Sequence, residues 1–133
     1  MFLLDTNVCV QYLRGKNLLV RQRLNACQRI EVRLCSVVLL ELYSGVLRSA
    51  RPAKNRADLD QFAAPFASLP FDDPCAELCA HIRHDLESLG TPIGPYDLQI
   101  AAIALAHGCT LVTHNTTEFS RVPGLLLEDW ELP

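Results

Sequence analysis

The chain has 133 residues, of which half are apolar, and a formal net charge of −3. This length suits one domain with its own hydrophobic core, and it leaves little room for a second domain. The longest apolar runs fall well short of the roughly 20 residues that a membrane-spanning helix needs. No basic stretch of the secretory kind opens the chain. We therefore expect a single cytoplasmic domain over residues 1–133 without membrane association.

In the first half of the chain, short apolar segments alternate with helical patterns. A strand is expected at Phe2–Leu4, directly before Asp5, and the next helix is expected to stop at Gly15. Ser36 is expected to cap the helix that follows the second strand. The expected elements are a strand at 2–4, helices at 6–14 and 18–26, a strand at 32–35, and helices at 36–50 and 55–67.

The second half continues the same alternation. Pro74 and Pro95 suit the first turns of two helices, and Gly90 and Gly108 mark helix ends. The expected elements are strands at 69–71, 109–113 and 125–127, and helices at about 72–89, 95–107 and 115–119. Because the strands lack an apolar–polar alternation of their own, the sequence predicts an α/β fold in which helices cover both faces of a parallel sheet.

The charged side chains are unevenly distributed. Residues 1–71 carry ten basic and five acidic side chains, whereas residues 72–133 carry two basic and ten acidic ones. Since the arginine fork matches phosphate oxygens, the basic half could hold nucleic acid beside an acidic centre. Charge alone favours a simpler interpretation, in which these side chains cover solvated faces of helices.

The six cysteines stand in apolar stretches and show no CxxC spacing. This pattern is typical of reduced, buried thiols. Cys75 and Cys79 lie one helical turn apart, with His81 and His84 nearby, but zinc ligands normally come as two separated, tightly spaced pairs.

Acidic and amide side chains stand where this fold would place functional residues. Asp5 follows the first strand, and Asp97 lies in the first turn of the helix expected from Pro95. Glu41 lies in the middle of an apolar helix, and Asn115 and Glu118 follow the fourth strand. Ligands of open α/β sheets bind at the carboxyl ends of the strands. Clustered carboxylates repel one another, and Mg²⁺ or Mn²⁺ relieves this repulsion and can activate water against a phosphate.

Each of these side chains also has a structural explanation. Asp5 is a favourable N-cap residue, and Asp97 would complement the dipole of its helix. Asn115 and Glu118 have the spacing of a capping box. Glu41 needs a partner or an ion if it is buried, unless it lies on a narrow exposed stripe. The acidic residues together favour a metal site, although none does so alone.

Six segments form a recognisable series of motifs: Leu3–Val8, Ser36–Gly45, Ile93–Ala102, Leu111–Phe119, Val122–Leu125 and Glu128–Trp130. In order and spacing, they resemble the motifs of PIN domains, and in particular those of the VapC toxins of bacterial toxin–antitoxin pairs. The likeness covers essentially the whole chain.

The resemblance implies a PIN-like three-layer α/β/α fold with a central, mostly parallel sheet of four to five strands. It also implies endoribonuclease activity that depends on Mg²⁺ or Mn²⁺. By this analogy, Asp5, Glu41 and Asp97 are metal-binding catalytic residues, and Glu118 is a further catalytic acid.

The same analogy implies supporting polar roles for Asn7, Thr113 and Asn115. Many PIN domains carry an aspartate where this chain has Asn115, so the resemblance leaves open whether Asn115 or Glu118 completes the acidic site.

The resemblance further implies an RNA substrate, a cognate antitoxin protein and a homodimer. The apolar faces of the first two helices and of the helix at 36–50 are the expected docking surfaces for the antitoxin. Two other functions fit the same motifs: a housekeeping PIN nuclease in RNA maturation, and a non-catalytic PIN scaffold that only binds a partner protein.

Overall fold

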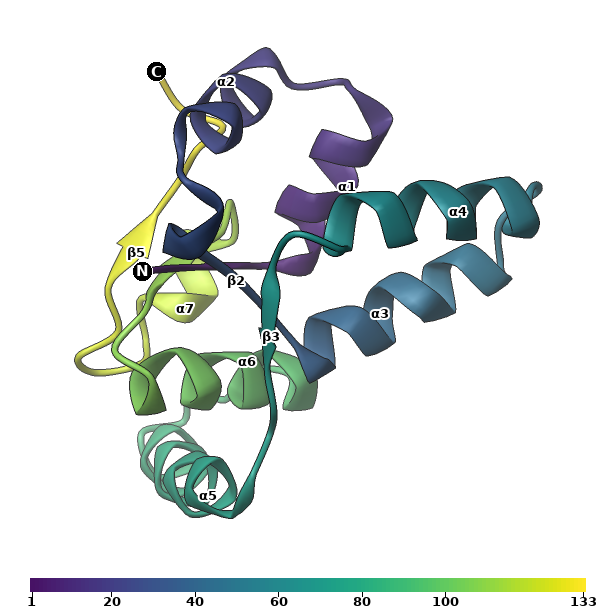
Figure 1. The fold of residues 1–133 in the computed structure, drawn as a ribbon. Helices are drawn as coiled ribbons and strands as arrows, with labels where there is room; N and C mark the ends of the chain where they lie inside the picture. Colours follow the sequence, from purple (N-terminus) through teal and green to yellow (C-terminus); the bar gives the residue numbers. More distant parts are fainter.

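In the computed structural model, which describes residues 1–133, five parallel strands form one sheet in the order β3-β2-β1-β4-β5 (Figure 1). Every neighbouring pair of strands is parallel. This arrangement confirms the predicted α/β class and the predicted strand number. The strands are β1 (Phe2–Leu4), β2 (Val32–Cys35), β3 (Ala67–Leu69), β4 (Thr110–Val112) and β5 (Leu127–Glu128).

Seven α-helices connect and cover the strands, which gives the predicted α/β/α arrangement. In Figure 1, α5 and α6 lie below the strands, α1 and α2 lie above them, and α3 and α4 extend to the right as a pair. No helix is both long enough and apolar enough to cross a membrane. The helices are α1 (Thr6–Arg14), α2 (Leu18–Ala26), α3 (Ser36–Leu47), α4 (Pro52–Ala63), α5 (Asp73–Ser88), α6 (Pro95–Ala106) and α7 (Thr116–Phe119).

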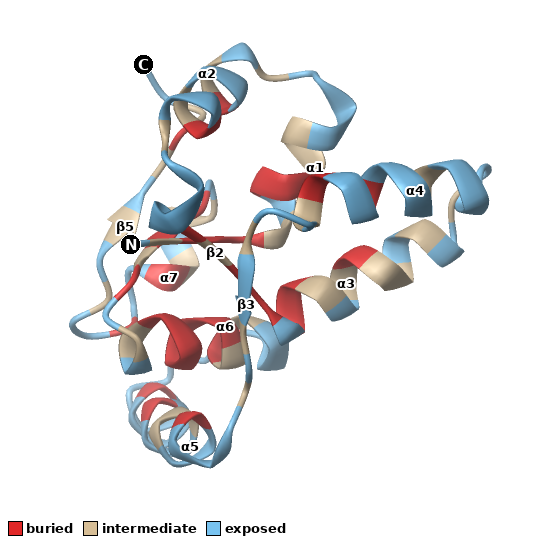
Figure 2. Ribbon diagram, viewed as in Figure 1, coloured by how far each residue is buried: buried red, intermediate tan, exposed pale blue.

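The core lies around the two central strands. Leu3, Leu4, Leu111 and Val112 are fully buried because helices cover both faces of β1 and β4 (Figure 2). Helix α6 is buried around most of its circumference, including every residue from 100 to 104. A parallel sheet with both faces covered requires such continuous apolar runs, and they are the runs from which the strands were predicted.

The predicted boundaries are wrong at a few places. Helix α3 ends at Leu47 instead of residue 50, and α4 starts at Pro52 and ends at Ala63 instead of spanning 55–67. Proline is favoured at the first helical position because the N–H it lacks would be unpaired there. A 3₁₀ turn at Arg29–Glu31 was not predicted.

The two edge strands are displaced from their predicted positions. Strand β3 covers 67–69 instead of 69–71, and β5 covers 127–128 instead of 125–127. Pairing sets these limits, since Arg33 lies opposite Ala67 and Val112 lies opposite Glu128. Ala67 and Glu128 are exposed, so no apolar pattern marks them in the sequence.

All six cysteines are free thiols, as predicted, and Cys9, Cys35, Cys75 and Cys109 are buried. The cysteine and histidine side chains of α5 do not form a group of three metal-ligand atoms in close proximity. The structure therefore gives no support to zinc binding there.

Leu111 in β4 and Leu126 before β5 form a matched pair for testing the core. Leu111 is fully buried, whereas 66% of Leu126 is exposed. We expect Leu111→Ala to lower the free energy of unfolding by about 2–5 kcal/mol, because it removes buried methyl groups and leaves a cavity. Leu126→Ala is expected to change it by less than about 0.5 kcal/mol. Urea denaturation of both variants tests this, and equal losses would contradict the assigned core.

Candidate acidic active site

The central strands bring Asp5 and Thr113 to the same edge of the sheet. The Asp5 N–H donates to the Val112 carbonyl at 2.9 Å, and the Thr113 N–H donates to the Glu128 carbonyl at 2.9 Å, which extends the pairing by one residue beyond β1 and β4. The Thr113 hydroxyl then donates to Asp5 Oδ2 at 2.8 Å. This buried contact joins two of the predicted site residues directly.

Asp5 caps a helix and also contributes to the acidic site. Its Oδ1 accepts from the Thr6 N–H at 2.8 Å, at the start of α1. The residue is only 6% exposed, and this burial raises the pKa of Asp5 above its ordinary value, with a smaller contribution from the charge of Glu41. The hydrogen bonds from Thr113 and Thr6 oppose the increase by stabilising the ionised form.

Glu41 accepts a hydrogen bond from a residue of α1. The Thr6 hydroxyl donates to Glu41 Oε1 at 2.6 Å, across the contact between α1 and α3. Glu41 is half-buried, so its place in an apolar helix is explained by this partner and not by a fully exposed stripe. The sequence analysis did not single out Thr6, because its bond to Glu41 depends on the packing of α1 against α3.

Asp97, in the first turn of α6, is the most strongly perturbed of the acids. Its pKa is raised to about 7, first by burial, then by the charges of Asp5 and Glu118, by a hydrogen bond with Glu118, and by the charge of Glu41. The structure therefore brings together all four acids that the sequence singled out.

The Asn115 turn holds Glu118 at the site. The Asn115 side-chain amide donates to Glu118 Oε2 at 3.2 Å, and its backbone N–H donates to the Thr113 hydroxyl at 3.0 Å. The Asn115 side chain makes no capping hydrogen bond to α7. The capping-box explanation for this pair is therefore wrong, because the amide orients the carboxylate instead.

These contacts form one chain of hydrogen bonds from Glu41 through Asp5 to Glu118, and its links are formed by Thr6, Thr113 and Asn115. The Asp97 carboxyl lies near the acids of this chain. Asn7 is exposed and makes no side-chain hydrogen bond, so its supporting role stays a prediction.

The donor set suits a hard divalent cation. All of its charged groups are carboxylates, and Mg²⁺ and Mn²⁺ prefer oxygen ligands. No three of these carboxylates place a ligand atom each within 4.8 Å of one another; the group that meets this criterion, His114, Asp129 and Glu131, lies elsewhere. An ion here would therefore be held by one or two carboxylates, with water at its other positions, which is the usual arrangement for Mg²⁺.

Comparison with known proteins first defines the class. Residues 2–125 match the PIN-domain family. The chain is 40% identical over 97% of both chains to the tRNA(fMet)-specific endonuclease VapC of Shigella flexneri, and 34% identical over 98% of both chains to ribonuclease VapC2 of Rickettsia felis. Its fold is similar to that in the crystal structure of DNA-bound VapBC from Salmonella typhimurium, with a TM-score of 0.91, 37% identity and 97% coverage of both chains.

The chain belongs to the VapC family of PIN-domain ribonucleases. This assignment confirms the resemblance stated from its motifs, and with it the prediction of an endoribonuclease of the toxin type.

The raised pKa of Asp97 predicts how its replacement affects stability. Because the pKa is near 7 in the folded chain and 3.8 without the perturbation, folding of the metal-free protein loses stability as the pH rises from about 4 to 7. At pH 8 in EDTA, Asp97→Asn should raise the free energy of unfolding by about 1 kcal/mol, a value reduced for the partial exposure of the site.

Denaturation of wild type and Asp97→Asn at pH 8 and pH 4 measures this effect, which should be absent at the lower pH. Asp85→Asn, on the exposed side of α5, is the matched control and should change little at either pH. A destabilised Asp97→Asn at pH 8 would contradict the electrostatic description of the site.

Proposed function

We propose that this chain, acting as one PIN domain over residues 1–133, hydrolyses RNA phosphodiester bonds at the acidic centre with Mg²⁺ or Mn²⁺. The observation that carries the proposal is the clustering of four carboxylates in a partly buried site, where burial first and then the neighbouring acidic charges raise the pKa of Asp97 to about 7. Such a site is electrostatically unfavourable without a cation and favourable with one. The catalytic setting is the cytoplasm, where RNA is available.

In this proposal, Asp5 and Asp97 hold the ion directly or through water, and Glu41 binds it or orients a water molecule. When bound, the ion supplies charge stabilisation at the phosphate and lowers the pKa of water. Glu118, which accepts from the Asn115 side-chain amide, adds negative charge beside Asp97. Thr113 fixes the rotamer of Asp5, and its hydroxyl cannot donate to any other acceptor at the same time.

A basic side chain adjoins this centre. Arg14, at the end of α1, lines a groove of about 220 Å³ together with Glu41. Arg14 is exposed and forms no ion pair within the chain, so its guanidinium is free to bind a phosphate of the substrate. This placement supports phosphate binding by the basic half of the chain.

We propose a structured tRNA as the substrate. The supporting observation is the identity of 40% and 38% to two enzymes named tRNA(fMet)-specific endonucleases. Sequence-specific recognition of RNA usually reads unpaired bases in loops, so cleavage should fall in a single-stranded loop of the tRNA.

Cleavage of tRNA(fMet) by the purified chain, with Mg²⁺, Mn²⁺ or EDTA, tests this function. We expect discrete products with metal, no products in EDTA, and a loss of at least about 100-fold for Asp97→Asn. Asp85→Asn, which makes the same aspartate-to-asparagine change outside the site, is the control. Cleavage by Asp97→Asn at the wild-type rate, or cleavage in EDTA, would refute the acidic site, and parallel digestion of total RNA separates an inactive enzyme from a different RNA target.

The toxin role is separated from a housekeeping role by its effect on cells. Expression of a toxin should arrest growth, and Asp97→Asn should relieve the arrest, whereas a maturation nuclease would be tolerated. A non-catalytic scaffold is disfavoured because Asp5, Glu41 and Asp97 are all present and brought together.

We also propose a cognate antitoxin as partner, since similar folds occur in complexes with antitoxins.

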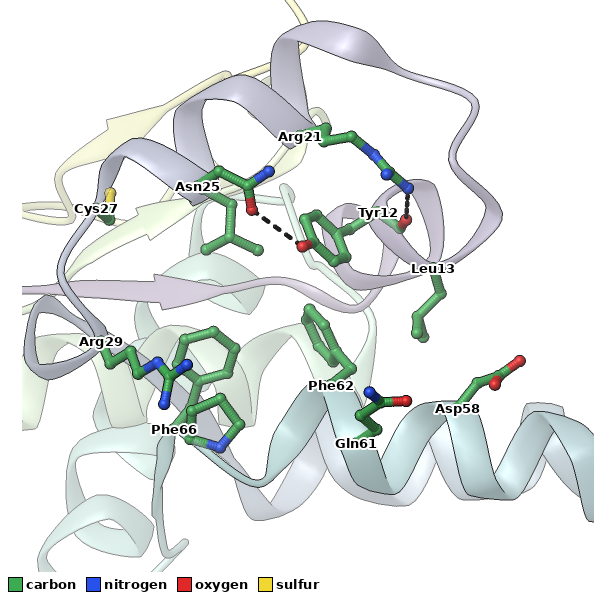
Figure 3. Close-up of a pocket in the computed structure, with 12 residues that line it drawn as sticks. Tyr12, Leu13, Arg21, Asn25, Cys27, Arg29, Asp58, Gln61, Phe62 and Phe66 are labelled. Atoms are coloured by element: carbon green, nitrogen blue, oxygen red, sulfur yellow. Dashed lines mark hydrogen bonds between the residues drawn. The ribbon is translucent and has the colours of Figure 1, made fainter.

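Two grooves meet at α1. One, of about 550 Å³, is lined by α1, α2 and α4 and contains the neighbouring rings of Tyr12 and Phe62, whose centroids are 5.2 Å apart and whose planes are tilted by 39° (Figure 3). Arg21 covers Tyr12 from the α2 side, and the Tyr12 hydroxyl donates to Asn25. The second groove is the one lined by Arg14 and Glu41.

Leu13 lines both grooves, which makes it the residue of choice for testing the docking surface. We expect Leu13→Glu to abolish co-purification with the protein encoded next to this chain, because it puts a charge into an apolar contact. Leu89→Glu, on an exposed leucine after α5, should leave co-purification unchanged. Retained binding by Leu13→Glu would place the antitoxin elsewhere. The proposed homodimer is tested by light scattering on the chain purified without the partner, where a mass near twice 14.8 kDa is expected.

A further inference from the structure

A second group of potential metal ligands lies outside the acidic centre, where the C-terminal tail passes β4. His114 Nδ1 lies 2.9 Å from Asp129 Oδ2 and 3.6 Å from Glu131 Oε2. One ligand atom from each of these three residues lies within 4.8 Å of the others. His114 and Asp129 are 15 residues apart in sequence, so the trio is not assembled within one turn or helix.

The two carboxylates are held in place by donors outside this trio of side chains. Glu131 Oε1 accepts from the Asn17 side-chain amide at 3.3 Å, and Asp129 Oδ1 accepts from the Glu131 backbone N–H at 3.0 Å. Each carboxylate therefore has one oxygen fixed by the protein and the other turned toward His114. Ligands at metal sites are commonly oriented in this way by hydrogen bonds to their remaining atoms.

These carboxylates have no cationic partner other than the imidazole. Their side chains are only 10% and 17% exposed, and none of the ion pairs to Asp129 or Glu131 involves a lysine or arginine. The nearby Arg23 guanidinium donates to the Asp129 backbone carbonyl at 3.0 Å and not to its carboxylate. Two poorly hydrated carboxylates therefore face one imidazole nitrogen, and a bound cation would stabilise their negative charges.

We propose that His114, Asp129 and Glu131 form a second site, which binds a divalent first-row transition metal such as Zn²⁺. One imidazole nitrogen with two carboxylates suits zinc and its neighbours better than Mg²⁺, which prefers oxygen alone. Bonds of about 2.0–2.2 Å to one ion place adjacent ligand atoms roughly 2.9–3.5 Å apart, close to the separations of His114 from both acids. Three protein ligands would leave at least one position for water.

This site is distinct from the acidic centre but connected to it through the backbone. His114 stands between Thr113, which donates to Asp5, and Asn115, which donates to Glu118. A cation at His114 would fasten the C-terminal tail to the loop that organises the acidic centre. The proposal does not depend on the nature of the substrate.

Zn²⁺ binding by the full chain tests the proposal, measured by competition with a chromogenic zinc chelator. Asp97→Asn serves as the background, so that binding at the acidic centre is weakened in every sample. In this background one equivalent of Zn²⁺ is expected, and adding His114→Asn or Glu131→Gln should weaken its affinity at least about tenfold. His84→Asn, which alters an exposed histidine of α5, is the matched control and should change nothing.

Melting temperatures in EDTA verify that the variants fold, since Asn and Gln can keep the neighbouring hydrogen bonds. If Zn²⁺ binds equally well after His114→Asn and Glu131→Gln, the ion is held elsewhere and the proposal is wrong. If the chain binds no Zn²⁺ at all, the imidazole serves only as an ion-pair partner, which also overturns it. Neither result bears on RNA cleavage, which is measured separately with Mg²⁺ or Mn²⁺.

Discussion

Four like charges at one edge of a parallel sheet are the constraint on which much of this structure depends. Burial and mutual repulsion work against the ionised forms of Asp5 and Asp97. Part of this cost is offset because hydroxyl, amide and backbone N–H groups donate hydrogen bonds to Asp5, Glu41 and Glu118. None of its buried side-chain polar atoms lacks a hydrogen-bond partner. The unfavourable free energy that remains comes from the burial and mutual repulsion of the carboxylates, which a bound cation would reduce.

The order of the strands explains why these groups meet. Strands β1 and β4 are neighbours in space but more than a hundred residues apart in sequence, and parallel pairing places their carboxyl ends side by side. Asp5 and Thr113 directly follow those ends. Helices α3 and α6 then add Glu41 and Asp97, so the site needs most of the fold to exist.

Most of the fold and most of the site could be predicted from the sequence. The central strands and α6 are continuous apolar runs because they are buried on all sides, and this burial leaves a clear pattern. Strands β3 and β5 were misplaced because backbone pairing sets their limits while residues such as Ala67 and Glu128 stay exposed.

At the site, the sequence predicted that Asp5, Asp97 and the turn at Asn115 lie close together, and the structure brings them together. Thr6 was missed because a threonine at a helix start has an ordinary structural explanation, and only the packing of α1 against α3 reveals its bond to Glu41. The capping-box interpretation of Asn115 and Glu118 failed for a related reason: spacing shows that two side chains can meet, but not which of them donates to which.

The short edge strands have a consequence for assembly. Strand β3 has three residues and β5 has two, so each edge of the sheet offers few free backbone groups to a strand from another molecule. Long, flat edges promote open-ended association, and shortening them is a common protection against aggregation. A chain built in this way is more readily engaged through the hollows between its helices than by extension of its sheet, which favours partners that arrive as helices or irregular segments and form closed complexes of defined size.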